Sequence, residues 1–395
     1  MNAEEIFQSY RDNVLNTYTK TPLIIVKGKG SYVWDIHGKK YLDFFPGWGV
    51  GSLGHCHQKV VSAIKDQVGK LIFVPNSYYN VPQAVLAHEL SRLSGAAFKA
   101  FFCNSGAEAN EGAIKLSRKF GNGRYEIITF ENSFHGRTLA ALSATGQKKY
   151  QQGFAPLVQA FKTVKFNDLE AVKRAVNEKT VAVMLELIQG EGGINIAGKE
   201  FVQGLRRLCD EKKFLLIVDE VQTGFGRTGK MFAWQDFGIV PDVFTLAKAL
   251  GGGLPIGVMM VKNDFSGLLT PGTHASTFGG GPVVCRAALA VLRAIQKERL
   301  LYHAGEMGRY LYEKLKELQE GNPLVIGIRG SGLMWGVQLQ REGKSVVEEC
   351  LKRGLLINCT HDTVLRIMPS LKVSTSEINK AVKILKRALE KCVSV

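Results

Sequence analysis

The sequence of 395 residues contains no long hydrophobic run and no paired cysteine motif. A membrane-spanning helix needs roughly 18 or more consecutive apolar residues, so we expect none here and no membrane partner. The first residues, MNAEEIFQSYRDNVLN, are acidic and then polar, unlike a signal or transit peptide. The seven cysteines are scattered, which favours free thiols in a reducing compartment. We therefore expect a cytoplasmic protein.

Acidic residues are in short supply as well. The chain has 51 lysines and arginines against 35 aspartates and glutamates, a formal net charge of +16. Such a charge is compatible with nucleic-acid binding. However, the basic residues are spread along the chain, and no RNP, finger or basic-helix pattern accompanies them. We expect no nucleic-acid partner and a preference for anionic small molecules.

The middle of the chain alternates short apolar runs with longer stretches of helical periodicity. The runs cover residues 97–104, 125–131, 180–188 and 214–221, and PDVFTLAKAL and IGVMMVK continue the series. Near-continuous apolar strands separated by helices are typical of a parallel sheet that is covered on both faces. We predict a large α/β domain over residues 46–285, with a mostly parallel sheet.

The two ends of the chain have a different pattern, which predicts a smaller α+β domain built from residues 1–45 and 286–395. SYVWDIHGKKYLDF predicts a hairpin that turns at residues 36–39. In the C-terminal part, strand-like runs such as VIGIRGSGLMWGVQL stand between helical patterns. The last helix is expected to begin at a capping box formed by Ser374 and Glu377.

Polar residues follow several of the predicted strands, where ligands bind in open α/β sheets. Ser105 and Gly106 open a helix, and the free N–H groups of a helix start suit a phosphate. An ordinary N-cap serine with a turn glycine is the alternative. Asp219 ends another run, where a carboxylate needs a positive partner. The protonated ring nitrogen of a cofactor would supply that charge, and an aspartate that caps a loop is the alternative.

Two further strand ends and one lysine carry candidate ligand groups. Phe134 offers a face for a planar ring, and Arg137 a fork for a carboxylate. Ser276 and Thr277 precede a glycine run that suits a second phosphate contact. The alternatives are that Phe134 belongs to the core and Arg137 to the surface, and that Ser276 and Thr277 form an ordinary turn. Lys248 stands among apolar residues in FTLAKALGGGLPIGV, so it is either an exposed helix residue or a buried amine used in chemistry.

Some motifs are misleading. Residues 224–230 contain GxGxxG and approach a P-loop, but the stretch neither follows a strand directly nor opens a helix. Met231 also stands where a P-loop has Ser or Thr. The pair His55 and His57 has no nearby carboxylate cluster in the sequence. We therefore expect neither a nucleotide nor a metal site.

Seven motifs then identify a family. They are FFCNSGAEANEGAIKL, ITFENSFHGRTLAALSAT, IQGEGG, LLIVDEVQTGFGRTG, PDVFTLAKALGGGLPIG, HASTFGGGP and VLRIMPSL, and in this order they span nearly the whole chain. With them the sequence resembles the class III, fold-type I pyridoxal-phosphate (PLP) aminotransferases, most closely the acetylornithine-type members. The resemblance implies PLP as the cofactor, the fold of the PLP-dependent transferases of type I, and a homodimer with shared active sites.

The resemblance also implies residue roles. Lys248 and Asp219 would be catalytic, with Lys248 bonded to the cofactor aldehyde and Asp219 paired with the ring nitrogen. Thr277 would reach a phosphate across the dimer interface. The implied cofactor-binding residues are Ser105, Gly106, Phe134, Asp219, Glu220, Val221, Gln222, Lys248 and Thr277. The implied substrate-binding residues are Tyr18, Arg137, Glu191, Ser276 and Arg366.

The implied reaction is ping-pong transfer of the δ-amino group of N2-acetylornithine to 2-oxoglutarate. Arg137 would hold the α-carboxylate of acetylornithine and Arg366 that of glutamate. Glu191 would mask Arg366 during the other half-reaction. The alternatives are ornithine, succinylornithine or 4-aminobutyrate as the amino donor, or an aminomutase or decarboxylating transaminase of the same fold.

Three positions depart from the pattern of the resembled family. Gln58 and Leu187 stand where the family usually has proline, which bears on the local backbone and not on the reaction. Trp48 occupies a position near the substrate where relatives vary between aliphatic and aromatic residues. It bears on which acyl group the site accepts.

Overall fold

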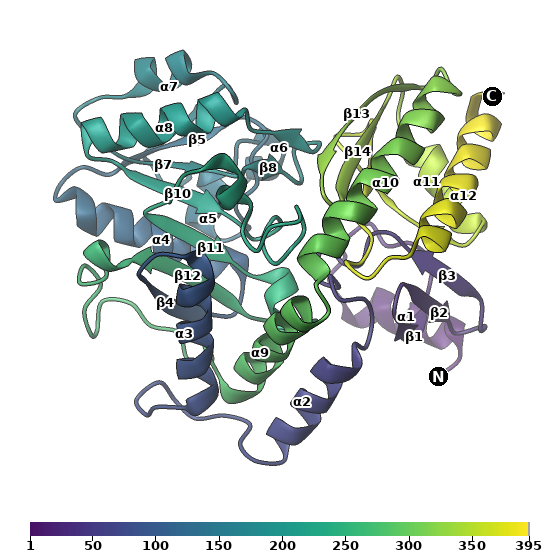
Figure 1. The fold of residues 1–395 in the computed structure, drawn as a ribbon, viewed down its shortest axis with the longest axis horizontal. Helices are drawn as coiled ribbons and strands as arrows, with labels where there is room; N and C mark the ends of the chain where they lie inside the picture. The colour runs from purple at the N-terminus through teal and green to yellow at the C-terminus, as the bar shows by residue number, and fades with distance from the viewer. Residues whose placement is uncertain (394–395) are drawn as a thin grey trace.

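The computed structural model describes residues 1–393. Figure 1 shows a large sheet with helices on both faces, beside a second group of strands and helices that contains both chain termini. The large sheet has the strand order β4-β12-β11-β10-β7-β5-β6. Its strands are β4 (Phe98–Cys103), β5 (Glu126–Phe130), β6 (Phe161–Val164), β7 (Thr180–Leu185), β10 (Leu215–Asp219), β11 (Val243–Leu246) and β12 (Gly257–Lys262).

The predicted α/β class and the mostly parallel sheet are confirmed, with one strand as an exception. β12 runs antiparallel to both of its neighbours, β11 and β4. The reason is the connection between β11 and β12, residues 247–256. It is too short for a parallel crossover, which needs about a dozen residues or more. The same short connection carries Lys248.

The central strands β7, β10 and β11 are buried along their whole length because both faces of the sheet are covered. Consecutive residues of a strand point to opposite faces. Accordingly Ile217 joins the core cluster under α4 (Gly106–Gly121), whereas Val218 joins the larger cluster under α8 (Lys199–Lys212). The other helices of this part are α3 (Val81–Ser94), α5 (Leu139–Ala144), α6 (Lys148–Gln151) and α7 (Leu169–Ala175).

Two smaller four-stranded sheets complete the chain beside the short pair β8 (Ile188–Gln189) and β9 (Asn195–Ile196). The predicted hairpin is confirmed as β2 and β3, and the short β15 pairs with β3, so the two ends of the chain share a sheet. The domain boundaries at residues 46 and 285 stay a prediction. The strands are β1 (Ile25–Lys29), β2 (Tyr32–Asp35), β3 (Lys40–Asp43) and β15 (Leu355–Leu356), and then β13 (Val325–Ser331), β14 (Met334–Leu339), β16 (Asn358–Thr360) and β17 (Val364–Ile367).

Two consecutive helices, α9 (Pro282–Lys297) and α10 (Leu300–Glu320), lead from the large sheet to the smaller sheets (Figure 1). The predicted capping box is confirmed, because Ser374 accepts the N–H of Glu377 and Glu377 accepts the N–H of Ser374. Within residues 1–393, no helix combines the length and apolar character needed to span a bilayer. The remaining helices are α1 (Ala3–Asn13), α2 (Gln58–Val68), α11 (Lys344–Lys352) and α12 (Thr375–Val393).

Candidate active site

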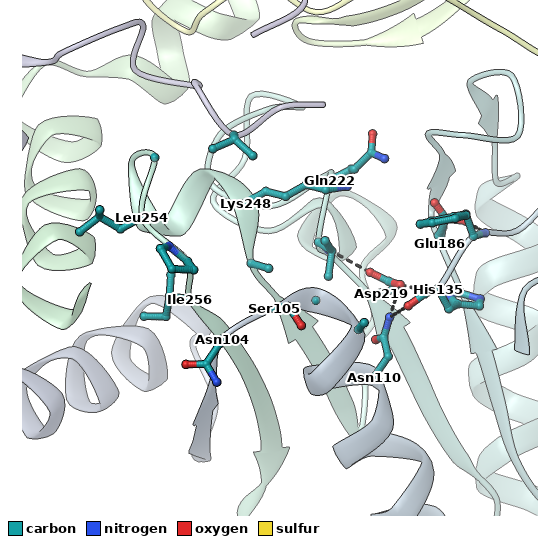
Figure 2. Close-up of a pocket in the computed structure, with 18 residues that line it drawn as sticks. Asn104, Ser105, Asn110, His135, Glu186, Asp219, Gln222, Lys248, Leu254 and Ile256 are labelled. Carbon is teal, nitrogen blue, oxygen red and sulfur yellow. Dashed lines mark hydrogen bonds and ion pairs between the residues drawn. The ribbon is translucent and has the colours of Figure 1, made fainter. Parts of the chain in front are cut away.

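A cavity of about 410 Å³ lies where β10 ends and α4 begins. This is the edge of the sheet at which α/β proteins bind ligands, and the volume suits a small cofactor with its substrate. Seven of the residues that the sequence analysis assigned to the cofactor line it, namely Ser105, Gly106, Phe134, Asp219, Val221, Gln222 and Lys248. Figure 2 shows Lys248 and Gln222 entering from one side and Asp219 lying below them.

The start of α4 forms one wall of the cavity. Ser105 is the N-cap, and its hydroxyl accepts the N–H of Glu108 at 3.1 Å. The N–H groups of Gly106 and Ala107, in the first turn, have no partner within the helix and line the cavity, so this end favours an anionic group. Gly106 is required for packing, because a Cβ there would come within 2.8 Å of the Val221 side chain.

Asp219 is buried at the end of β10 and is held by three donors. Its Oδ2 atom accepts hydrogen bonds from Asn110 Nδ2 and lies against His135 Nδ1, each at 2.8 Å. Its Oδ1 atom accepts the N–H of Val221 at 3.0 Å. Asn110 also donates to the carbonyl of His135 at 2.7 Å and accepts from Thr245 at 2.7 Å. The carboxylate therefore has a fixed position and orientation, as the dashed lines in Figure 2 show.

The sequence analysis did not single out Asn110 or His135. Asn110 lies on the face of α4 that carries Ala113 and Ile114 into the core. A polar residue at an apolar position of a helix is a signal that could have identified it. His135 was visible only as part of the motif around Phe134.

A second buried carboxylate, Glu186, stands next to this group. It accepts the N–H groups of Phe134 at 2.8 Å and of Gly190 at 3.2 Å. Burial raises the pKa of Glu186, the charge of Asp219 raises it further, and His135 opposes both. The Nε2 atom of His135 is buried and has no hydrogen-bond partner within residues 1–393. The His135 imidazole therefore interacts electrostatically with both carboxylates, Asp219 and Glu186.

Lys248 begins a short 3-10 helix directly after β11, and its backbone is left-handed with φ 45°. That conformation is unfavourable for a residue with a side chain, and it turns the amine into the cavity. Burial lowers the pKa of Lys248 to about 8, although Glu191 and Asp219 oppose the shift. No hydrogen bond or ion pair holds the amine within the described part of the chain. The residue is half-buried and its amine faces the cavity, and near pH 8 a far larger fraction of it is neutral than of a free lysine.

An ion pair lies beside the cavity, where neither partner is a lining residue but one of them contacts the lining residue Gln222. Arg366 Nη1 lies 2.6 Å from Glu191 Oε1, and Gln222 donates to the same oxygen at 3.2 Å. Arg366 is 1% exposed and is held further by the side chain of Asn358 and the carbonyl of Gly190, both at 2.8 Å. Burial alone would raise the pKa of Glu191, but Arg366 outweighs it and lowers that pKa. Because Arg366 belongs to β17, this pair connects the small sheet to the cavity.

The structure does not bring every expected residue to the cavity. The side chain of Glu220 points away from it, because it accepts hydrogen bonds from the Thr223 hydroxyl at 2.6 Å and the Trp234 N–H at 2.8 Å. Thr277 and Tyr18 are exposed on loops. Ser276 lies at the margin, where its hydroxyl accepts from Asn104 at 3.2 Å. Arg137 is also exposed, beside Phe134.

The positions that depart from the family pattern lie in different surroundings. Gln58 is exposed at the first position of α2, and Leu187 is fully buried. Trp48 is partly exposed and packs edge-on against Phe45, with ring centroids 5.6 Å apart. None of the three lines the cavity.

The two histidines of the GHCH motif each contact a carboxylate. His55 contacts Asp43 at 2.7 Å and His57 contacts Glu298 at 3.3 Å. Among the described residues, no three His, Cys, Asp or Glu side chains are grouped as for a metal ion.

The sequence profile of the family Aminotransferase class-III matches residues 14–389. The chain belongs to the class-III aminotransferases. Among similar proteins of this family, the acetylornithine aminotransferase of Methanocaldococcus jannaschii is 50% identical over 376 residues, 94% of each chain. The acetylornithine aminotransferase of Caldanaerobacter subterraneus subsp. tengcongensis is 50% identical over 378 residues, 94% of this chain and 96% of the relative.

Solved structures of this aminotransferase family have the same fold. The ornithine aminotransferase from Toxoplasma gondii superposes with a TM-score of 0.96 at 31% identity, covering 100% of this chain and 96% of that one. The acetylornithine aminotransferase from Elizabethkingia anophelis superposes with a TM-score of 0.88 at 29% identity, covering 99% and 100%. The family, the enzyme class and the fold expected from the sequence are therefore confirmed.

Proposed function

We propose that this class-III aminotransferase moves the δ-amino group of N2-acetyl-L-ornithine to 2-oxoglutarate, with PLP as its cofactor. The single observation that carries the chemistry is the Lys248 amine, with its lowered pKa, in one cavity with Asp219. The substrate assignment is supported by relatives at 50% identity that are named acetylornithine aminotransferases. The second candidate donor is ornithine, because ornithine aminotransferases are among the solved structures with the same fold.

The residues of the cavity fit PLP. The start of α4, with Ser105 and Gly106, suits its phosphate, and the buried carboxylate of Asp219 suits a protonated ring nitrogen. Gln222 presents a buried Oε1 atom that lacks a partner within residues 1–393, as a group awaiting a ligand would. Phe134 lines the same cavity and offers a ring face. PLP, when bound, draws electrons from the substrate carbon that carries the amine.

The side chains of this chain supply the proton transfers. Because burial lowers its pKa to about 8, Lys248 can hold its amine neutral and then carry a proton from and to the reacting substrate carbon. Asp219 keeps its place through Asn110, His135 and the Val221 N–H, so a cationic ring nitrogen would always meet it in the same geometry.

Acetylornithine and glutamate must react in turn at the same point of the site, and we propose that two arginines distinguish them. Arg137 takes the α-carboxylate of acetylornithine at the exposed side of the cavity. Arg366 takes that of glutamate once Glu191 has released it. The contact of 2.6 Å between Arg366 and Glu191 supports this, because it masks the guanidinium with a carboxylate that a substrate can replace.

We also propose a homodimer whose two copies share active sites. Apolar side chains are exposed on the loop after α2 and around Thr277, which supports an interface there rather than contact with water. The side chains are Leu71 at 44%, Ile72 at 68%, Tyr78 at 67%, Tyr79 at 105% and Phe278 at 65% exposure. Residues 1–45 and 286–395 form the proposed small domain, with support from the pairing of β3 with β15.

The deciding experiment compares single-turnover reactions of the PLP-loaded protein with acetylornithine, ornithine, succinylornithine and 4-aminobutyrate. We expect the highest kcat/KM with acetylornithine. A protein that takes up no PLP would overturn the cofactor assignment, and a higher kcat/KM with ornithine would overturn the substrate assignment. Lys248→Ala is expected to abolish turnover, and full activity of that variant would remove Lys248 from its role.

The Arg366 assignment has its own test. Arg366→Ala should impair the half-reaction with glutamate far more than the half-reaction with acetylornithine. Both half-reactions are measured separately by rapid mixing, and their rate constants are compared, because a loss of folded protein lowers the amplitude and leaves the rate constant unchanged. Equal losses would contradict the proposed exchange between Glu191 and the substrate.

A further inference from the structure

We infer that Tyr150 is a positioning residue, which fixes the guanidinium of Arg137 for the carboxylate of the amino donor. The inference rests on the proposed function, since it takes Arg137 as the group that binds this carboxylate. Neither the sequence motifs nor the lining of the cavity singles out Tyr150. Instead, the contacts of Arg137 single out Tyr150.

The guanidinium of Arg137 lies against two aromatic rings. Its central carbon is 4.1 Å from the ring centroid of Tyr150 and 5.4 Å from that of Phe134. The two rings meet edge to face, with centroids 5.6 Å apart and an interplanar angle of 83°. Phe134 also lines the cavity, so this aromatic pair joins the position of Arg137 to that of the reacting group.

Tyr150 supports Arg137 in a way that leaves its N–H groups free to bind. Arg137 makes no ion pair or hydrogen bond within residues 1–393, although it is exposed beside the cavity. A carboxylate of the protein would hold it by occupying the same N–H groups that a substrate needs. A ring face attracts the cation through its quadrupole and leaves the edge of the guanidinium open.

The ring of Tyr150 stands on a rigid base. It belongs to the short helix α6, whose last residue, Gln151, donates from Nε2 to the carbonyls of Leu142 at 3.1 Å and Thr145 at 2.9 Å. Gln147, directly before α6, donates to the carbonyl of Ser133 at 3.2 Å. Because both ends of α6 are tied to the segments around Phe134 and α5, the ring is held in place relative to the cavity.

This geometry assigns a specificity role to Tyr150. An exposed arginine loses side-chain entropy when it grips a carboxylate, and a support that holds it in advance reduces that loss. Tyr150 should therefore favour donors whose carboxylate reaches Arg137 while their amine lies at the reacting position. Donors that lack this carboxylate should not depend on Tyr150.

The test compares acetylornithine with N-acetyl-1,4-diaminobutane, which is the same molecule without its carboxylate. In Tyr150→Leu we expect KM for acetylornithine to rise roughly two- to fivefold, the size of a lost cation–π contact at an exposed site, with kcat nearly unchanged. The kcat/KM for the carboxylate-free donor should stay as in the unmodified protein. Tyr150→Phe keeps the ring and should restore the KM for acetylornithine. Tyr302→Leu, at an exposed tyrosine of α10, is the matched control and should change neither donor.

A second measurement does not depend on turnover. N-acetylnorvaline is acetylornithine without the reacting amine, and its Kd is measured by calorimetry on the PLP-loaded protein. We expect roughly two- to fivefold weaker binding in Tyr150→Leu and unchanged binding in Tyr150→Phe.

Several outcomes would overturn the role of Tyr150. They are an unchanged KM and Kd in Tyr150→Leu, an equal loss with both donors, or no rescue by Tyr150→Phe. If the unmodified protein does not prefer acetylornithine over its carboxylate-free analogue, the proposed function fails as well. That result is distinguishable because it appears without any substitution.

Discussion

The Nδ1 atom of His135 lies 2.8 Å from Oδ2 of Asp219, and both side chains are almost completely buried. The imidazole and Asn110 Nδ2 both contact this oxygen, while the N–H of Val221 holds Oδ1. A buried carboxylate without such partners would be strongly destabilising. His135 is therefore part of what makes an anion at the end of β10 tolerable before any cofactor binds.

Removing this partner should lower stability. In His135→Leu, Asp219 keeps Asn110 but loses a buried hydrogen bond. We expect the free energy of unfolding of the cofactor-free protein to fall by about 1–3 kcal/mol. Urea denaturation measures it, with His88→Leu as the control at an exposed histidine of α3. Equal stability of the two variants would contradict the structural role of His135.

Lys248 should show its lowered pKa directly. Burial brings this pKa to about 8, so the neutral amine becomes dominant above that pH. In the cofactor-free protein, the rate of reductive methylation at Lys248 should rise with a midpoint near pH 8, followed by peptide mass spectrometry. A model peptide with a free lysine, whose pKa is about 10.4, is the reference. A midpoint equal to that of the peptide would show that the amine is solvated.

The stability of the folded protein should depend on pH through the ionisation of Glu298. Burial would raise its pKa, but hydrogen bonds and charges from Lys372 at 2.7 Å and Lys59 at 3.0 Å outweigh burial and lower the pKa to about 2. A carboxylate with a lowered folded-state pKa stabilises the protein above its unfolded pKa, about 4.3, and loses that effect as the pH falls toward 2. Glu298→Gln should thus be less stable than the unmodified protein at pH 7, by about 1–2 kcal/mol. The difference should shrink steadily below about pH 4.3, as urea denaturation at several pH values would reveal. A difference independent of pH would rule out the ion pairs as its cause.

Two glycines of α10 form a matched pair with opposite predictions. Gly305 has open space where a Cβ would lie, so Gly305→Ala should stabilise the helix by about 0.5–1 kcal/mol. At Gly308, a Cβ would clash with the carbonyl oxygen of Gly332, so Gly308→Ala should destabilise the protein. Thermal unfolding of both variants tests the pair. A stabilising Gly308→Ala would show that the contact between α10 and the turn at Gly332 can relax.

Local patterns in the sequence predicted much of the architecture. Apolar runs predicted six of the seven strands of the large sheet and missed the edge strand β6, whose FKTV sequence is half polar. The residues at the ends of the predicted runs included Ser105, Asp219 and Lys248, which the structure brings to one cavity. These predictions succeed because strand periodicity and helix capping depend on residues a few positions apart. The role of each residue came from the resemblance to the aminotransferases, since no single motif distinguished a cofactor site from a loop.

Other features of the site needed the tertiary structure. Arg366 meets Glu191 across 175 positions of sequence, and Asn110 meets Asp219 across 109. The antiparallel direction of β12 and the stacking of Arg137 on Tyr150 belong to the same group. Such contacts depend on how whole elements pack, and a sequence pattern carries no information about which distant side chain will be nearest.

The sequence by itself determined which segments become strands, where polar groups stand at their ends, and to which family the chain is similar. Only the tertiary structure decided which of those polar groups share a cavity and which, like Glu220, turn away to satisfy backbone N–H groups. The physical reason is that burial acts on the assembled site. A lysine in an apolar stretch acquires a lowered pKa only when the folded chain removes water from around it.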